Sequence, residues 1–347
     1  MHHHPRSIRL GISAAVALTA LGLSGCADDD PTTVTLVTHG TFSIPDEVIA
    51  SFEEDTGLTL ELIVAGESGS IVNELILTQD RPLGDVVYGI EIASAAQGSE
   101  AGLFAEYAST QPAADDAAAY ALPGTEGLTA IDVSDVCINV DHRWFADQGI
   151  PEPESLTDLA DPEYRGLLSV SNPATSATGT SFLLATVAAF GDGWGDYWAD
   201  LRDNDVRVVS SWSDAYYTDF SGPSSGGAYP LVLSYASSPP YEVGDDGEAP
   251  TGALLDTCFR HVEYAGVLDG AANPTGAEKV VDWLLSDDFQ ATLPESMYVY
   301  PVSSRVALPE DWTQYAPLSD HPWILDPDVI ADNVEEWVRE WTDLVLG

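Results

Sequence analysis

The chain has 347 residues, and its 57 acidic and 11 basic side chains give a formal charge of −46 at pH 7. A charge of this size and sign excludes nucleic acid as a partner and disfavours binding to anionic lipid surfaces. It permits cationic small solutes, although an acidic solvated surface alone accounts for it. The length is enough for two lobes that each form a hydrophobic core.

The N-terminus has the layout of a secretory signal, because two arginines precede an apolar run over residues 11–23. The run ends at Leu23-Ser24-Gly25-Cys26, which resembles the bacterial lipobox. A membrane span is the alternative, but a span needs roughly 20 apolar residues. We therefore expect a signal peptide over 1–26, a tether over 27–33, and lipid anchoring through Cys26 on the outer face of the cell membrane. The run His2-His3-His4 falls in the removed segment.

Two cysteines, Cys137 and Cys258, remain after this processing site. Export places them outside the reducing cytosol, where disulfides persist. Both lie in strand-like runs, over 136–140 and 258–262. The sequence allows either a disulfide between neighbouring strands or two buried free thiols.

Strand and helix signals alternate along the first part of the chain. Strands are expected at 34–37, 58–64 and 85–88, with helices over 45–52 and 71–77 between them. Strands separated by helices imply a parallel sheet with right-handed crossovers, whose ligands collect at the carboxyl ends of the strands. The binding site is therefore expected in the loops that follow the strands.

Two segments rich in hydroxyl groups follow later strands. The first is a loop over 172–181 that leads into an apolar helix over 182–190, and the second is Ser234-Tyr235-Ala236-Ser237-Ser238-Pro239. Hydroxyls and amides at a helix N-terminus can bind an anion, although a simple helix cap is the commoner role of such residues. Because two such segments occur, we expect them to face one cleft and to hold a phosphate or hydroxyl group.

The chain from about Val34 to its C-terminus resembles the thiamine-binding proteins of thiamine ABC importers. The order and spacing of several stretches carry this resemblance. These are Thr38–Phe42, Glu67–Ser70 with Asn73-Glu74-Leu75, Asp85–Val87, Gly102–Ala105, Asn172–Gly179, Ser211–Tyr216, Leu233–Pro239 and Tyr300–Val302.

The resemblance implies the α/β fold of the type II periplasmic binding proteins, with two lobes, a hinge and a ligand cleft between the lobes. The expected boundaries are 34–137 with 258–302 for lobe 1, 138–257 for lobe 2, and 303–347 for a C-terminal helical segment. We expect a monomer that is not an enzyme and has no cofactor or metal. It would capture thiamine, thiamine monophosphate or thiamine diphosphate and deliver it to the permease of an ABC importer.

The resemblance also implies the residues that contact the ligand. Ser68 and Gly69 would act from one lobe, and Ser176, Ala177, Trp212, Tyr235, Ala236, Ser237 and Ser238 from the other. Aromatic faces suit a flat aminopyrimidine and a cationic thiazolium, and Trp212, Tyr235 and Tyr298 are the candidates to supply them. Amides and hydroxyls of 68–70 and 176–178 would bind a phosphate.

Three positions depart from the family pattern. His39 replaces an aromatic residue after the first strand, Tyr298 stands where the family has tryptophan, and Ser68 replaces a carboxylate. Glu67 adjoins Ser68 and is expected to take over its polar contact, with Ser70 in the same loop. These three departures therefore allow the protein to differ from the family in its preference among thiamine, its phosphates and related pyrimidines.

Three other functions compete with this reading. Ferric-ion binding is suggested by Tyr216-Tyr217, but iron prefers several anionic oxygens or imidazoles converging on one point, and the sequence does not indicate such a cluster. A polyamine ligand would suit the acidity and the aromatics. A secreted hydrolase would need a nucleophile with a general base, and the sequence does not indicate a histidine placed as the partner of a serine.

Overall fold

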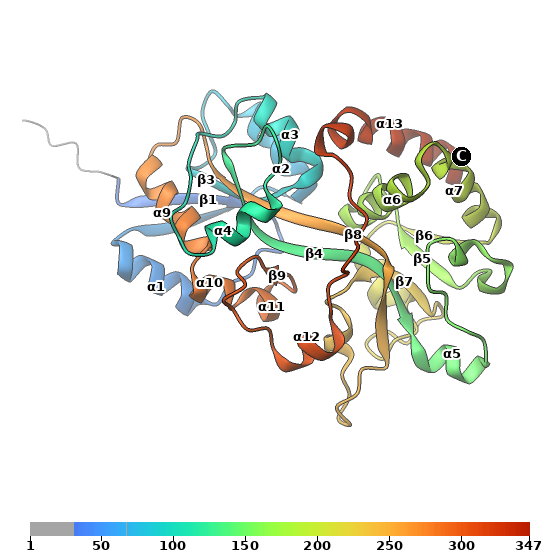
Figure 1. Ribbon diagram of the computed structural model, residues 1–347. Coiled ribbons are helices and arrows are strands. Elements are labelled where there is room, and N and C mark those ends of the chain that lie inside the picture. The colour runs from blue at the N-terminus through green and yellow to red at the C-terminus, as the bar shows by residue number, and fades with distance from the viewer. Residues whose placement is uncertain (1–30, 67) are drawn as a thin grey trace, which may run out of the picture. The chain divides into compact units, whose positions relative to one another are not determined.

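Two long strands, β4 (Leu128–Asp141) and β8 (Thr251–Val267), pair antiparallel in the middle of a mixed sheet. They are seen in a computed structural model that describes residues 31–66 and 68–347 (Figure 1). The predicted signal peptide with Cys26 and the predicted contact Glu67 lie outside the described residues. The signal peptide, the lipid anchor and the contact by Glu67 therefore remain predictions.

The sheet of the described residues has nine strands in the order β2-β1-β3-β8-β4-β7-β5-β6, with β9 beside β4. The first three neighbours pair parallel at one end, and β7, β5 and β6 pair parallel at the other. The remaining strands are β1 (Thr33–Thr38), β2 (Thr59–Val64), β3 (Val86–Glu91), β5 (Leu168–Ser171), β6 (Arg207–Val209), β7 (Leu231–Tyr235) and β9 (Tyr300–Pro301).

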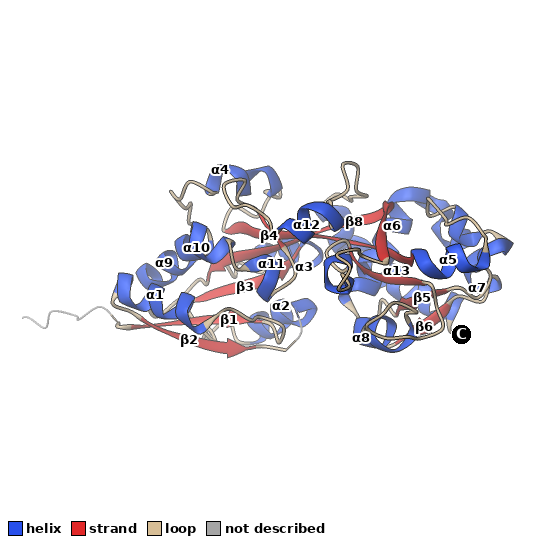
Figure 2. Ribbon diagram, turned by 90° about the horizontal axis from the view of Figure 1, so that it is seen from below, coloured by secondary structure: helices blue, strands red, loops and turns tan. Residues whose placement is uncertain are grey.

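Helices lie on both sides of these strands (Figure 2). They are α1 (Asp46–Thr56), α2 (Ser68–Leu77), α3 (Ile92–Glu100), α4 (Ala114–Ala117), α5 (His142–Gln148), α6 (Ala177–Phe190), α7 (Trp194–Asp203), α8 (Trp212–Asp214), α9 (Pro274–Leu284), α10 (Asp287–Gln290), α11 (Leu293–Ser296), α12 (Glu310–Tyr315) and α13 (Pro327–Val345).

The predicted alternation at the start of the chain is confirmed, because β1, α1, β2, α2 and β3 occur in that order. One helix boundary was predicted wrongly. Helix α6 begins at Ala177, within the segment predicted as a loop up to residue 181. The hydroxyl-bearing residues fit the helix because they bond locally, as when the Thr180 hydroxyl donates to the Pro173 carbonyl at 2.9 Å.

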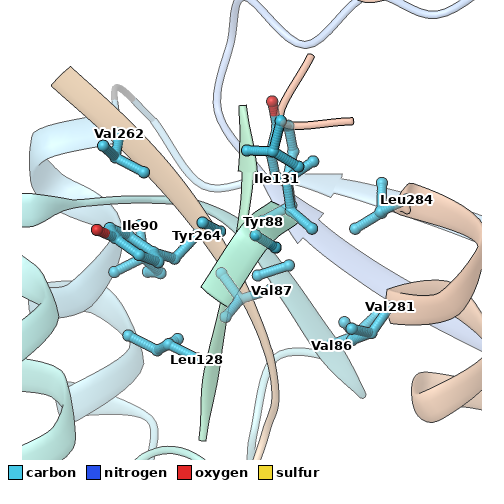
Figure 3. Close-up of a cluster of buried hydrophobic side chains, with 14 of the residues drawn as sticks. Val86, Val87, Tyr88, Ile90, Leu128, Ile131, Val262, Tyr264, Val281 and Leu284 are labelled. Atoms are coloured by element: carbon cyan, nitrogen blue, oxygen red, sulfur yellow. The ribbon is translucent and has the colours of Figure 1, made fainter. Parts of the chain in front are cut away.

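One hydrophobic core surrounds β1, β3 and the adjoining half of β8. Figure 3 shows part of it, where side chains of β3 meet those of β4, β8 and α9. Val86 and Val87 on β3 and Leu284 on α9 are fully buried, and the exposed fraction of Val281 on α9 is 1%. Continuous apolar runs such as this one are expected for strands covered on both faces.

A second core surrounds β5, β7, α6 and α7. Trp198 on α7 and Trp341 on α13 meet there edge to face, with ring centroids 5.2 Å apart. Helix α13 also contributes Ile330 to the first core, so it contacts both. The C-terminal segment that was expected to be helical contains this helix, which packs by its apolar face. The predicted lobe boundaries remain a prediction.

A disulfide joins Cys137 on β4 to Cys258 on β8, and both residues are fully buried. It lies where the pairing of the two strands changes register, since Val136 pairs with Phe259 but Ile138 pairs with Leu254. Thr257 fills part of this irregularity by accepting a hydrogen bond from the Ile138 amide at 2.9 Å. The covalent bond thus holds the two central strands together where their ladder is interrupted.

Candidate functional site

The candidate site is a cavity of about 370 Å³ beside the central strands. This volume lies in the range of small-molecule sites, roughly 300–1,000 Å³. Residues far apart in the sequence line it: His39, Thr41, Glu91, Ser134, Ala177, Trp212, Tyr216, Tyr217, Tyr235, Ser237, Ser238, Tyr241, His261, Glu263, Ser296, Met297, Tyr298 and Val299. Several of these follow the ends of β1, β3, β6 and β7, where the sheet rule places ligands.

Trp212 is the centre of the aromatic part of the lining. Tyr216 stacks on Trp212 nearly parallel, with centroids 5.4 Å apart, and Tyr235 meets it edge-on at 5.9 Å. Tyr217 also meets the indole edge-on, at 5.3 Å, so a ligand can contact Trp212 on the part of the ring that these tyrosines leave in the cavity lining. A flat or cationic group suits an aromatic face.

The position of Trp212 is set by the local sequence. Ser211 caps helix α8 by accepting a hydrogen bond from the Asp214 amide at 3.1 Å, so Trp212 is the first helical residue. The indole NH donates to Ser234 Oγ at 2.9 Å, and Ser234 in turn bonds Ser238 at 2.8 Å. The predicted serine-rich segment therefore orients the predicted tryptophan.

Tyr298 closes another part of the cavity and has an uncommon backbone conformation. Its φ is 59°, a left-handed value that non-glycine residues rarely adopt. The Ser237 hydroxyl donates to the Tyr298 carbonyl at 2.7 Å, and Tyr241 meets the Tyr298 ring edge-on at 5.6 Å. Strained residues held by their surroundings often occur at ligand sites.

A row of three carboxyl groups crosses the sheet at the same cavity. Strand pairing sets Glu91 on β3 opposite Glu263 on β8, and Glu263 opposite Asp132 on β4. Residues directly opposite in neighbouring strands have their Cβ atoms about 4.5–5.5 Å apart. In the next row on this face, His261 pairs with Ser134.

The carboxyl groups of Asp132 and Glu263 have different pKa values despite similar burial. Burial and the neighbouring Glu263 charge raise the pKa of Asp132 well above its usual value. Burial also opposes ionisation of Glu263, but attraction from His39 and His261 holds the Glu263 pKa below its usual value. Tyr88 donates its hydroxyl to both groups, at 2.5 Å to Asp132 and 3.3 Å to Glu263. Of the two carboxyl groups, Glu263 is therefore the more readily ionised, and it is the one that lines the cavity.

His39 lies beside the carboxyl row. Its Nε2 atom is 3.5 Å from Glu263 Oε2, and its Nδ1 atom is 2.7 Å from Thr41 Oγ1. Gly89 makes room for this ring, because a Cβ atom at position 89 would lie 2.2 Å from His39 Cδ2. Gly89 also has a φ of 97°, which favours glycine.

Seven of the predicted contact residues line the cavity together, namely His39, Ala177, Trp212, Tyr235, Ser237, Ser238 and Tyr298. Two others do not line it. Ser176 precedes α6 and its hydroxyl bonds Thr178 at 2.9 Å, while Ala236 is fully buried against the disulfide. Ser68, Gly69 and Ser70 form the start of α2. The ligand contacts themselves remain predictions.

Sequence reasoning missed the residues Glu91, Ser134, His261 and Glu263. A signal for two of them was present, because His261 and Glu263 alternate with Val262 and Tyr264 in the last part of β8, where every residue is buried. Charged residues are almost never buried without a partner, so their position in such a strand indicates a functional site. Glu91 could be linked to them only through the pairing of β3 with β8.

Comparison with known proteins defines the class to which this fold and cavity belong. The chain belongs to the bacterial extracellular solute-binding protein family, whose model matches residues 82–323. The predicted type II periplasmic binding protein fold is confirmed. In the described ranges 31–66 and 68–347, no helix has both the length and the apolar character needed to cross a membrane.

Among individual proteins, the chain is 27% identical to a thiamine-binding periplasmic protein of Escherichia coli over 89% of this chain and 92% of the relative. It is 24% identical to a protein of the same name from Brucella suis, over 89% and 91%. The solved structure of a periplasmic thiamin binding protein matches with a TM-score of 0.74 and 24% identity, over 90% of this chain and 96% of the other. Iron-bound HitA from Pseudomonas aeruginosa matches with a TM-score of 0.72 and 18% identity, over 90% and 99%.

Proposed function

We propose that this chain captures thiamine or a thiamine phosphate outside the cell and delivers it to the permease of an ABC importer. One observation carries the proposal. A single cavity combines the indole of Trp212 with the carboxylate of Glu263 and with small hydroxyl groups. Its aromatic and anionic groups complement a flat, positively charged solute.

The chemistry of thiamine matches this lining. A thiazolium ring carries a permanent positive charge, and stacking a cation on an indole contributes about 0.5–2 kcal/mol depending on desolvation. The aminopyrimidine is flat and has donors and acceptors at its edge, which serine hydroxyls and carboxylates can satisfy. The similarity to relatives named as thiamine-binding supports the same ligand.

A phosphorylated form of thiamine is part of the proposal. Ala177 lines the cavity as the first residue of α6, whose N-terminal amides favour an anion. The start of α2 at Ser68 is the other predicted phosphate contact. We expect these two helix starts to hold the phosphate of thiamine monophosphate or diphosphate.

Delivery requires a change that the permease can recognise. We expect the two predicted lobes to pivot about β4 and β8, the strands that pair at the centre of the sheet. The ligand shifts such an equilibrium only by the difference between its affinities for the open and closed forms. We further propose that Cys26 anchors the protein to the outer face of the cell membrane, and that the protein is a monomer without catalytic activity or cofactor.

Calorimetric titration of the purified protein tests the ligand. We expect thiamine, thiamine monophosphate or thiamine diphosphate to bind with a Kd below about 1 μM, which corresponds to roughly −8 kcal/mol. Ferric citrate and spermidine, the ligands of the two competing transport functions, should bind at least about 100-fold more weakly, a difference of roughly 2.8 kcal/mol.

Two results would contradict the proposal. The first is the absence of binding by all three thiamine compounds. The second is tight binding of ferric ion with the colour of a tyrosinate complex. In the structure the Tyr216 hydroxyl is engaged with Glu242 at 2.9 Å, so it would have to leave this acceptor to bind iron.

A further inference from the structure

We propose that Glu91, His261 and Glu263 form a binding site for a divalent transition-metal cation within the solute cavity. Each of the three offers one ligand atom, and these atoms lie within 4.8 Å of one another. Their exposed fractions are 7%, 9% and 7%, so they do not belong to an ordinary solvated acidic surface. The site goes beyond the proposed function and shares the carboxylate of Glu263 with it, so a metal cation and a cationic solute would compete for this group.

The kind of cation follows from the ligand atoms. One imidazole nitrogen and two carboxylate oxygens suit Zn²⁺ and its first-row neighbours, whereas Mg²⁺ and Ca²⁺ prefer oxygen alone. Two deprotonated carboxylates balance the charge of a dication, which favours a buried site. In a tetrahedral zinc site the ligand atoms lie about 2.0–2.2 Å from the ion and roughly 3.4 Å from one another. Rotation of the three side chains toward one another, by an amount on the order of 1 Å, would therefore complete the site.

His39 is placed to add a second imidazole. Its Nε2 atom lies 3.5 Å from Glu263 Oε2, on the side of the cluster. Thr41 holds the opposite ring nitrogen at 2.7 Å. Metal-binding histidines commonly have the other nitrogen fixed in this manner, because the hydrogen bond sets the tautomer and the ring orientation.

Ser134 provides an independent indication that a ligand belongs here. Its side chain is 1% exposed, lines the cavity, and pairs with His261 across the two central strands. Among the described residues, its hydroxyl has no hydrogen-bond partner. A buried polar group without a partner is unfavourable, and a metal-bound water or ligand would supply a partner.

The electrostatics of the carboxyl row favour the same conclusion. Glu91 lies directly opposite Glu263, and like charges in directly opposite positions of a sheet are destabilising. A cation between Glu91 and Glu263 would convert this repulsion into attraction.

Titration of the metal-depleted protein with Co²⁺ tests the site, because the visible absorption of Co²⁺ reports its ligands. Wild type should bind one more Co²⁺ per chain than His261→Gln or Glu91→Gln, or should bind Co²⁺ at least about tenfold more tightly than these variants. Zn²⁺ should displace the Co²⁺ bound by wild type. The run His2-His3-His4 is common to all the proteins, so its own binding cancels in the comparison.

His142→Gln is the matched control, because His142 forms a surface pair with Glu152 at 2.8 Å. It should titrate as wild type. Circular dichroism shows whether each variant folds, and if one does not, the other decides. If His261→Gln and Glu91→Gln both bind Co²⁺ as wild type does, the proposed metal site is wrong. Loss of thiamine binding in Glu91→Gln without any Co²⁺ difference would overturn it as well, because the cluster would then serve the organic solute alone.

Discussion

Replacing Trp212 with alanine is expected to weaken thiamine binding by roughly 10–30-fold, since cation stacking is worth up to about 2 kcal/mol and 1.4 kcal/mol is tenfold. Trp212 lines the cavity, and its indole would lie against the ligand. Trp212→Phe keeps an aromatic face but loses the hydrogen bond to Ser234, so its effect should be smaller. Calorimetric titration of Trp212→Ala and Trp212→Phe with thiamine measures the Kd of each variant.

Trp144→Ala is the matched control for this loss. Trp144 packs edge-on against Phe145 with centroids 5.1 Å apart, in the second core and away from the cavity lining. This substitution should lower stability but leave the Kd for thiamine unchanged. Equal affinity in wild type and Trp212→Ala would contradict the assignment of the aromatic face.

Removing the disulfide is expected to lower the free energy of unfolding by about 2–5 kcal/mol, the usual range for a native disulfide. The bond links residues 121 positions apart, and long loops gain most from closure in the chain-entropy model. It also spans the register shift between β4 and β8, so the double variant Cys137→Ala with Cys258→Ala loses a constraint where the hydrogen-bond ladder is weakest. Urea unfolding of the double variant and wild type measures the difference.

The remaining cysteine provides the control for this measurement. Cys26→Ala removes a thiol that precedes the folded residues, and it should leave the unfolding midpoint unchanged. An unchanged midpoint in the double variant, or three reactive thiols instead of one in denatured wild type without reductant, would contradict a stabilising disulfide.

Local sequence patterns were sufficient to predict the first five elements of the fold. The apolar runs of β1 and β3 and the helical spacing of α2 are local signals, and the structure places elements where they predict them. The start of α6 was predicted wrongly because serine, threonine and glycine favour loops on average. Here their hydroxyls bond within the helix or to the preceding turn, which no local pattern reveals.

The cavity was predictable on its aromatic side and not on its carboxyl side. Trp212 and the segment 235–238 follow strand ends, and that position alone indicated the site. The carboxyl row depends on the pairing of three strands that are distant in sequence, since Glu91, Asp132 and Glu263 meet only through β3, β8 and β4. Strand order is a property of the whole fold, so these residues could be joined only in three dimensions.

The crystal structure of the protein with thiamine is the most direct test of the proposed function. We predict that the thiazolium or the pyrimidine ring stacks on the indole of Trp212, within contact of Tyr235 and Tyr298. Thiamine bound elsewhere, or a cavity that stays without thiamine at concentrations well above the measured Kd, would contradict the proposal.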